Sequence, residues 1–155
     1  MSGDPLQKIR EVALYLAERC SDDPRFGRVK LAELLFRCDF AAYAKFGESL
    51  TGAHYRRQPD GPLADEWSEA ERDLSNSADI GWLTGDQLAL VEEVVQRHQD
   101  EDGTDLQKLS RSFPGYALAA DGEAIPYHSV FISREAPTQA DIDWGLAVAR
   151  ELQEA

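Results

Sequence analysis

The fold is decided by one stretch, residues 28–63, which reads RVKLAELLFRCDFAAYAKFGESLTGAHYRRQPDGPL. When residues 29–46 are placed on a helix at about 100° per residue, their apolar side chains form two stripes about 140° apart. The first stripe consists of Leu31, Leu34, Leu35, Cys38 and Ala42, and the second of Val29, Phe36, Phe40 and Tyr43. A surface helix has one apolar stripe, so two stripes predict a central helix that other helices surround. The remaining face of the helix, between the outer edges of the two stripes, consists of Lys30, Glu33, Arg37 and Ala44.

Asp39 is the polar exception, because it projects between the two apolar stripes. An unpaired carboxylate would be costly there, so we expect Asp39 to be buried and to accept hydrogen bonds. The candidate donors are the Thr51-Gly52 backbone, the hydroxyls of Thr51 and Tyr43, and the side chains of Arg56 and Arg57. A structural anchor is favoured over a general base, since no nucleophile or metal ligand accompanies this aspartate.

Two turns follow the central helix. Gly47 is placed to end the helix in a left-handed conformation, and Thr51-Gly52 begins a turn into residues 54–57. Asp60-Gly61-Pro62 forms the second turn, after which a third helix can begin with Pro62 in its first turn. We expect that helix to extend to residue 74.

Capping signals predict three further helices. Asp4 is a candidate N-cap for the first helix, with Pro5 at its first position and Gln7 able to complete a capping box. The fourth helix begins with the capping-box pattern of residues 84–87, and the fifth begins at Thr104.

The C-terminal third of the chain predicts a hairpin and a last helix. Residues 116–127, folded about Asp121-Gly122, are typical of a small β-hairpin. The last helix is capped by Thr138 and Asp141, and its inward stripe consists of Ile142, Leu146, Ala149 and Leu152. Residues 1–155 are therefore expected to form a single, mainly α domain. It is a compact bundle of about six helices around residues 29–46, with a small β-hairpin near 116–127.

The overall composition narrows the classes of partner. A net charge of −13 disfavours direct binding to nucleic acid or to an anionic membrane, because both are polyanions. No apolar run approaches the roughly 20 residues of a membrane span, and the chain does not open with a signal peptide. Cys20 and Cys38 lie on apolar helical faces, which favours buried, reduced thiols in a cytoplasmic protein.

Motifs typical of enzymes and metal sites are absent from the sequence. It contains no Gly-rich phosphate loop, no Gly-x-Ser-x-Gly elbow, no His-Glu-x-x-His and no Cys-x-x-Cys. His54, His98 and His128 are scattered without the spacing of metal ligands. We expect no enzyme activity, no metal and no cofactor, and a small hydrolase or transferase is the least favoured interpretation.

Charge is separated into two blocks along the chain. Residues 25–57 contain seven basic and three acidic residues, a net charge of 7 − 3 = +4. Residues 60–105 contain two basic and fourteen acidic residues, a net charge of 2 − 14 = −12. Either block can be a solvated surface, but together they favour a polarised surface that binds a basic protein.

The opening stretch also resembles a known family, the Panacea domain of SocA-like antitoxins. The usual pattern of that family runs lysine-leucine, leucine-leucine-tyrosine, aspartate-phenylalanine, tyrosine-glycine, threonine-glycine, tyrosine and tyrosine-glycine-proline-valine. The matching residues are Lys30-Leu31, Leu34-Leu35-Phe36, Asp39-Phe40, Tyr43, Phe46-Gly47, Leu50-Thr51-Gly52, Tyr55 and Gly61-Pro62-Leu63. The chain departs from the pattern at residues 110–116, where the family has a threonine-histidine pair and a tryptophan, and at Arg57-Gln58, where it has another tryptophan.

The resemblance implies an antitoxin that neutralises a cognate protein toxin by direct binding, and a SocA-like member can act as an adaptor that delivers its toxin to a protease. The alternative is a phage- or mobile-element-associated interaction protein without a toxin. The residues expected to form or shape the partner-binding surface are Lys30, Asp39, Tyr43, Thr51, Gly52, Tyr55, Arg56, Arg57, Gly61 and Pro62.

Overall fold

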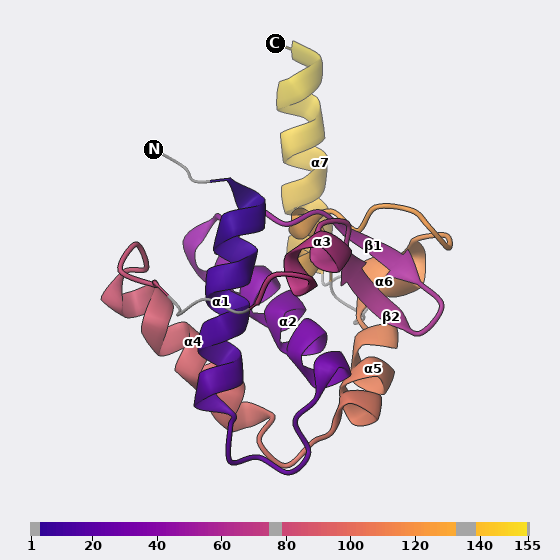
Figure 1. The fold of residues 1–155 in the computed structure, drawn as a ribbon. Coiled ribbons are helices and arrows are strands. Elements are labelled where there is room, and N and C mark those ends of the chain that lie inside the picture. The colour runs from indigo at the N-terminus through magenta and orange to yellow at the C-terminus, as the bar shows by residue number, and fades with distance from the viewer. Residues whose placement is uncertain (1–3, 75–78, 133–138, 155) are drawn as a thin grey trace.

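The computed structural model describes residues 4–74, 79–132 and 139–154 (Figure 1). The elements in these residues are, in order, α1 (Pro5–Arg19), α2 (Arg28–Phe46), β1 (Tyr55–Gln58), β2 (Gly61–Ala64), α3 (Trp67–Glu71), α4 (Gly85–Arg97), α5 (Gly103–Arg111), α6 (Pro114–Leu118), the 3-10 helix η1 (Tyr127–Phe131) and α7 (Gln139–Glu154). The mainly helical fold expected from the sequence is confirmed.

Helix α2 lies at the centre of this arrangement, as its two apolar stripes predict (Figure 1). It contacts α1, α4, α5, β2 and η1. Among the stripe residues only Val29 and Tyr43 are not buried, because they lie near the two ends of the helix. Gly47 ends the helix with a φ of 81°, a left-handed conformation that glycine adopts without steric cost.

Local capping accounts for the starts of α1 and α4. The side chain of Asp4 caps α1, and Pro5 occupies its first turn. Gln7 does not complete the expected capping box, because its amide donates to a glutamate one turn farther along. Thr84 and Gln87 do form the predicted capping box at the start of α4.

Two other helices begin where the sequence did not predict. Helix α5 is capped by Asp102, which forms a capping box with Asp105, so Thr104 lies inside the helix and not at its cap. Helix α3 begins only at Trp67, since residues 61–64 are held in a strand and Pro62 is not in a helix.

The small β-hairpin exists, but not where residues 116–127 predicted it. Strands β1 and β2 pair antiparallel, with Tyr55 opposite Ala64 and Gln58 opposite Gly61. The predicted segment instead contributes helix α6 and a single bridge, in which Ala124 lies opposite Arg56. Pro114 explains the helix, because proline favours the first turn. Strand β1 thus lies between β2 and the bridging segment, and β2, which carries a proline, is at the edge.

Aromatic rings fill the space between α2, the hairpin and η1. Phe40 lies 4.5 Å from Phe36, 5.6 Å from Tyr55, 5.5 Å from Phe113 and 4.8 Å from Tyr127, measured between ring centroids. All four pairs are edge-to-face or tilted, the arrangements that ring quadrupoles favour. This cluster ties residues 113–127 to the central helix and positions the hairpin over it.

Helix α7 extends away from the other helices (Figure 1). Its stripe of Ile142, Leu146 and Leu152 is exposed, which corrects the prediction that this stripe faces inward. The predicted cap at Thr138 lies outside the described residues, and Asp141 lies in the first turn of the helix. Within residues 4–74, 79–132 and 139–154, no helix combines the length and apolar character needed to cross a bilayer.

Candidate functional site

Asp39 joins α2 to the segment that leads into β1. Its carboxylate accepts hydrogen bonds from the Thr51 backbone N–H at 2.8 Å, the Thr51 hydroxyl at 2.7 Å and the Tyr55 hydroxyl at 2.7 Å. All three residues are buried. Burial raises the pKa of Asp39 to about 6, although the hydrogen bonds from Tyr55 and Thr51 oppose that shift. The sequence predicted the burial and the Thr51 donors, and this cluster links α2 to the chain that leads into β1.

The other candidate donors lie elsewhere. Tyr43 stacks against Tyr127, with ring centroids 5.6 Å apart, and lies 6.0 Å from the exposed ring of Phe131. Gly52 follows Thr51 with a φ of 77°, which a non-glycine residue rarely adopts. Tyr43 is therefore part of an aromatic surface near η1 and does not bind Asp39.

The two arginines of β1 hold the segment that follows α5. Arg56 pairs with Asp65 at 2.9 Å and donates to the Gly122 carbonyl at 3.1 Å. Arg57 donates to the Tyr116 carbonyl at 3.0 Å, and its guanidinium lies 4.6 Å from the Tyr116 ring centroid. Both guanidinium groups therefore bind within the fold, although the side chain of Arg56 is still exposed.

Lys30 is also internal, although the sequence placed it on the polar face of the helix. Its side chain is 2% exposed, and its ammonium donates to Asp23 at 2.7 Å and to the His98 carbonyl at 3.0 Å. A buried ammonium needs such acceptors. Lys30 thereby connects α2 to the loop after α1 and to the end of α4.

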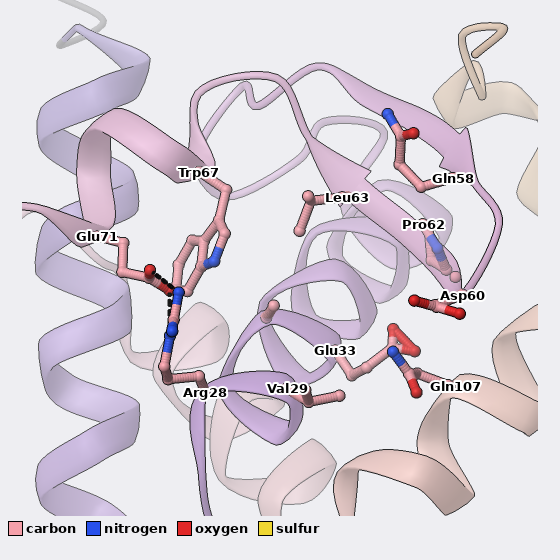
Figure 2. Close-up of a pocket in the computed structure, with 12 residues that line it drawn as sticks. Arg28, Val29, Glu33, Gln58, Asp60, Pro62, Leu63, Trp67, Glu71 and Gln107 are labelled. Carbon is pink, nitrogen blue, oxygen red and sulfur yellow. Dashed lines mark hydrogen bonds and ion pairs between the residues drawn. The ribbon is translucent and has the colours of Figure 1, made fainter.

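A pocket of about 400 Å³ lies beneath strand β2, between α2, α3 and α5 (Figure 2). It brings together the predicted residues Gly61 and Pro62, and sequence reasoning missed the others. Its lining consists of Arg28, Val29, Ala32, Glu33, Gln58, Asp60, Gly61, Pro62, Leu63, Trp67, Glu71 and Gln107. A mixture of apolar walls and a few polar groups is typical of small-ligand sites.

Glu33 lies at one side of this pocket, next to Gln107 and Asp60 (Figure 2). It is only 2% exposed, and its Oε1 has no hydrogen-bond partner among the described residues. Its Oε2 accepts one long hydrogen bond, 3.4 Å from the Ser110 hydroxyl. Burial raises the pKa of Glu33 to about 7, while Ser110 and Arg37 act in the opposite direction.

One feature of the sequence indicates that Glu33 can be buried. The two stripes of α2 leave a narrow third face, so an element that packs there must bury Lys30, Glu33 or Arg37. Helix α5 does so: Arg37 donates to the Leu106 carbonyl at 3.0 Å and to the Ser110 hydroxyl at 2.9 Å.

The two charge blocks partly fold against each other. Arg28 forms two hydrogen bonds to the carboxylate of Glu71, and Arg56 pairs with Asp65. Each pair joins a residue of the basic block to one of the acidic block. The basic and acidic residues, which are separated along the sequence, are therefore only partly separated on the folded surface.

Large apolar side chains are exposed mainly in α7 and near η1. On α7, Trp144 is 72% exposed and Leu146 is 60% exposed. Phe131 and Ile132 at the end of η1, and Leu118 at the end of α6, are also exposed. A group of large, exposed apolar side chains is typical of a surface that binds another protein.

Groups that could hold a metal ion do not occur in the described residues, where no three His, Cys, Asp or Glu side chains converge. Cys20 and Cys38 are buried free thiols. Burial raises the pKa of both, which makes them poor nucleophiles.

Comparisons with profiles of known protein families, with curated protein sequences and with solved structures find no match to this chain.

Proposed function

We propose that this protein is an antitoxin that acts in the cytoplasm and neutralises a cognate toxin by binding it. The proposal is motivated by the resemblance of residues 30–63 to the Panacea domain. The structural observation that supports it is helix α7, whose large apolar side chains are exposed. An exposed apolar helix is one of the recurring elements by which proteins bind one another, with side chains one turn apart as anchors.

The partner is inferred to be a basic protein with an apolar groove. Ile142 and Leu146 are one helical turn apart on α7, and 42% and 60% of their respective surfaces are exposed. Residues 139–154 contain four acidic residues and one basic residue, a net charge of 1 − 4 = −3, and the whole chain carries −13. A basic rim around an apolar groove would complement both properties of the helix.

Co-expression with the product of the neighbouring gene tests this proposal. The wild-type protein should restore the growth of cells that express the toxin, and the two proteins should co-purify. Replacement of both Ile142 and Leu146 by Glu should abolish rescue and co-purification while leaving the melting temperature unchanged, because both side chains are exposed.

The matched control places the same added charge on the same helix, with Gln139 and Gln153 each replaced by Glu. Both residues are exposed and polar, so this variant should rescue growth as the wild type does. Rescue by the apolar-to-Glu variant, or rescue by the wild type without any association or loss of toxin, would contradict the proposal.

A further inference from the structure

The pocket beneath β2 contains more negative than positive charge. Glu33, Asp60 and Glu71 contribute carboxylates to its lining, and Arg28 contributes the one guanidinium. Arg28 and Glu71 are paired with each other. Two carboxylates, those of Glu33 and Asp60, therefore remain without an ion-pair partner among the described residues, and they lie on the same side of the pocket (Figure 2).

Besides the excess of negative charge, the buried carboxylate of Glu33 is a second observation that points to a ligand. Its side chain is almost fully buried, its Oε1 is unpartnered, and it lines the pocket. A Cβ atom added to Gly61 would lie 3.5 Å from that oxygen, so this residue of β2 lies over Glu33 at ordinary van der Waals distance. An ionised carboxylate in this position attracts a cation strongly, because little water lies between them to screen the charge.

The remaining walls suit an aliphatic chain. Val29 and Leu63 are exposed apolar residues of the lining, and Pro62 and Trp67 are buried ones. Figure 2 shows Trp67 and Leu63 on the side of the pocket opposite Gln107. The volume of about 400 Å³ falls within the range of small-ligand pockets.

We propose, independently of the function proposed above, that this pocket binds a guanidinium or ammonium group carried on an aliphatic stem. The cationic group lies toward Glu33 and Asp60, and the stem lies against Leu63, Pro62 and Trp67. Such a group can belong to a small free cation or to a basic side chain of a bound protein. An anion is disfavoured, because the guanidinium of Arg28 is already neutralised by Glu71.

Isothermal titration calorimetry at pH 8 with three probes tests the inference. Butylguanidinium represents a free alkylguanidinium, N-acetylarginine amide represents a side chain within a protein, and N-acetylcitrulline amide is the neutral isostere. At least one cationic probe should bind about tenfold more tightly than the isostere. Tighter binding of butylguanidinium would identify a free small cation as the source, and tighter binding of N-acetylarginine amide would identify a protein side chain.

Glu33→Gln should weaken binding of the cationic probes about tenfold, and Asp60→Asn about threefold, because each removes one attractive charge. Asp60 is exposed at the turn, so its variant keeps the test valid even where Glu33→Gln affects folding. Glu48→Gln is the control: Glu48 is exposed just beyond α2 and does not line the pocket. Its affinity should match that of the wild type.

A pH series adds a second signature. The charged groups that face Glu33 are Arg37 on its own helix, Arg111 on α5 and Asp60 at the hairpin turn. Since the pKa of Glu33 is about 7, affinity should rise about fivefold from pH 6 to pH 8 and should change little in Glu33→Gln. Equal affinities for the cationic probes and the isostere, or unchanged affinity in both pocket variants, would overturn the inference.

Discussion

Asp39 and Thr51 are joined by two hydrogen bonds, one from the Thr51 backbone N–H to Oδ1 at 2.8 Å and one from its hydroxyl to Oδ2 at 2.7 Å. The Thr51 hydroxyl also accepts from the Ala53 backbone N–H at 3.1 Å. This connection fixes the chain after α2 before it enters β1. Asp39 and the Thr51-Gly52 turn both match the family pattern, and these hydrogen bonds give a structural reason for the two to occur together.

Asp39→Ala should lower the free energy of unfolding by about 1–3 kcal/mol, because it leaves the buried donors of Thr51 and Tyr55 unsatisfied. Asp39→Asn should cost less, since an amide oxygen can still accept. Chemical denaturation followed by circular dichroism measures both. An alanine variant as stable as the wild type would show that Asp39 does not anchor the turn.

Lys30→Ala should lower the free energy of unfolding by about 1–3 kcal/mol, because the Asp23 carboxylate and the His98 carbonyl lose a charged donor. Lys30→Met, which keeps the aliphatic stem, separates loss of charge from loss of packing. Lys45→Ala, an exposed change on the same helix, should have an effect within about 0.5 kcal/mol. Equal stability of the Lys30 and Lys45 variants would refute the internal role.

Glu33 should make stability fall as the pH rises. Burial raises its pKa from 4.5 to about 7, so the folded protein binds this proton more tightly than the unfolded chain does. The contribution of protonated Glu33 is fully present below about pH 4.5 and is lost as the pH rises toward about 7. The difference between the two pKa values corresponds to roughly 3 kcal/mol.

Glu33→Gln should therefore flatten the pH dependence of unfolding between pH 5 and pH 8 and should be more stable than the wild type at pH 8. Asp39, whose pKa is raised by burial to about 6, acts in the same direction and is unchanged in this variant. Urea denaturation at several pH values measures the effect, with Glu48→Gln as control. A variant with the wild-type pH profile would mean that Glu33 is not the titrating group.

Association with the proposed basic partner should slow as ionic strength rises, because the Debye length falls from about 10 Å at 0.1 M to about 3 Å at 1 M. Charge reversal at Glu69 and Asp86, which are exposed on α3 and α4, should lower the association rate more than it raises the dissociation rate. Glu66 is unsuitable for this test, since it binds the backbone and ring of His54. Stopped-flow rates that do not depend on salt would exclude electrostatic steering.

Few of the residues that match the family pattern line the pocket. Gly61, Pro62 and Leu63 do so, whereas Asp39, Thr51 and Tyr55 serve the internal anchor. Sequence reasoning grouped these residues because they are neighbours along one stretch. It could not separate their roles, because the separation depends on the face of α2 that each one approaches.

The local sequence alone, through helical periodicity and capping, determined several features of this protein. The two stripes of residues 29–46 required a surrounded helix, and Gly47 and the Thr84–Gln87 box marked helix ends. The position of Asp39 between apolar side chains required burial with donors. Each of these conclusions depends on residues within a few turns of one another, so helical periodicity and capping were sufficient.

Tertiary packing decided the rest. The strand at Gly61–Ala64 exists because it pairs with β1, and Ala124 meets Arg56 only because an aromatic cluster brings α6 and η1 to α2. Glu33 became a buried acid because α5 and the hairpin cover the one polar face of α2. Periodicity identifies which side of a helix is apolar. It cannot reveal which element far along the chain will cover a polar side, since that depends on how all the apolar faces are buried together.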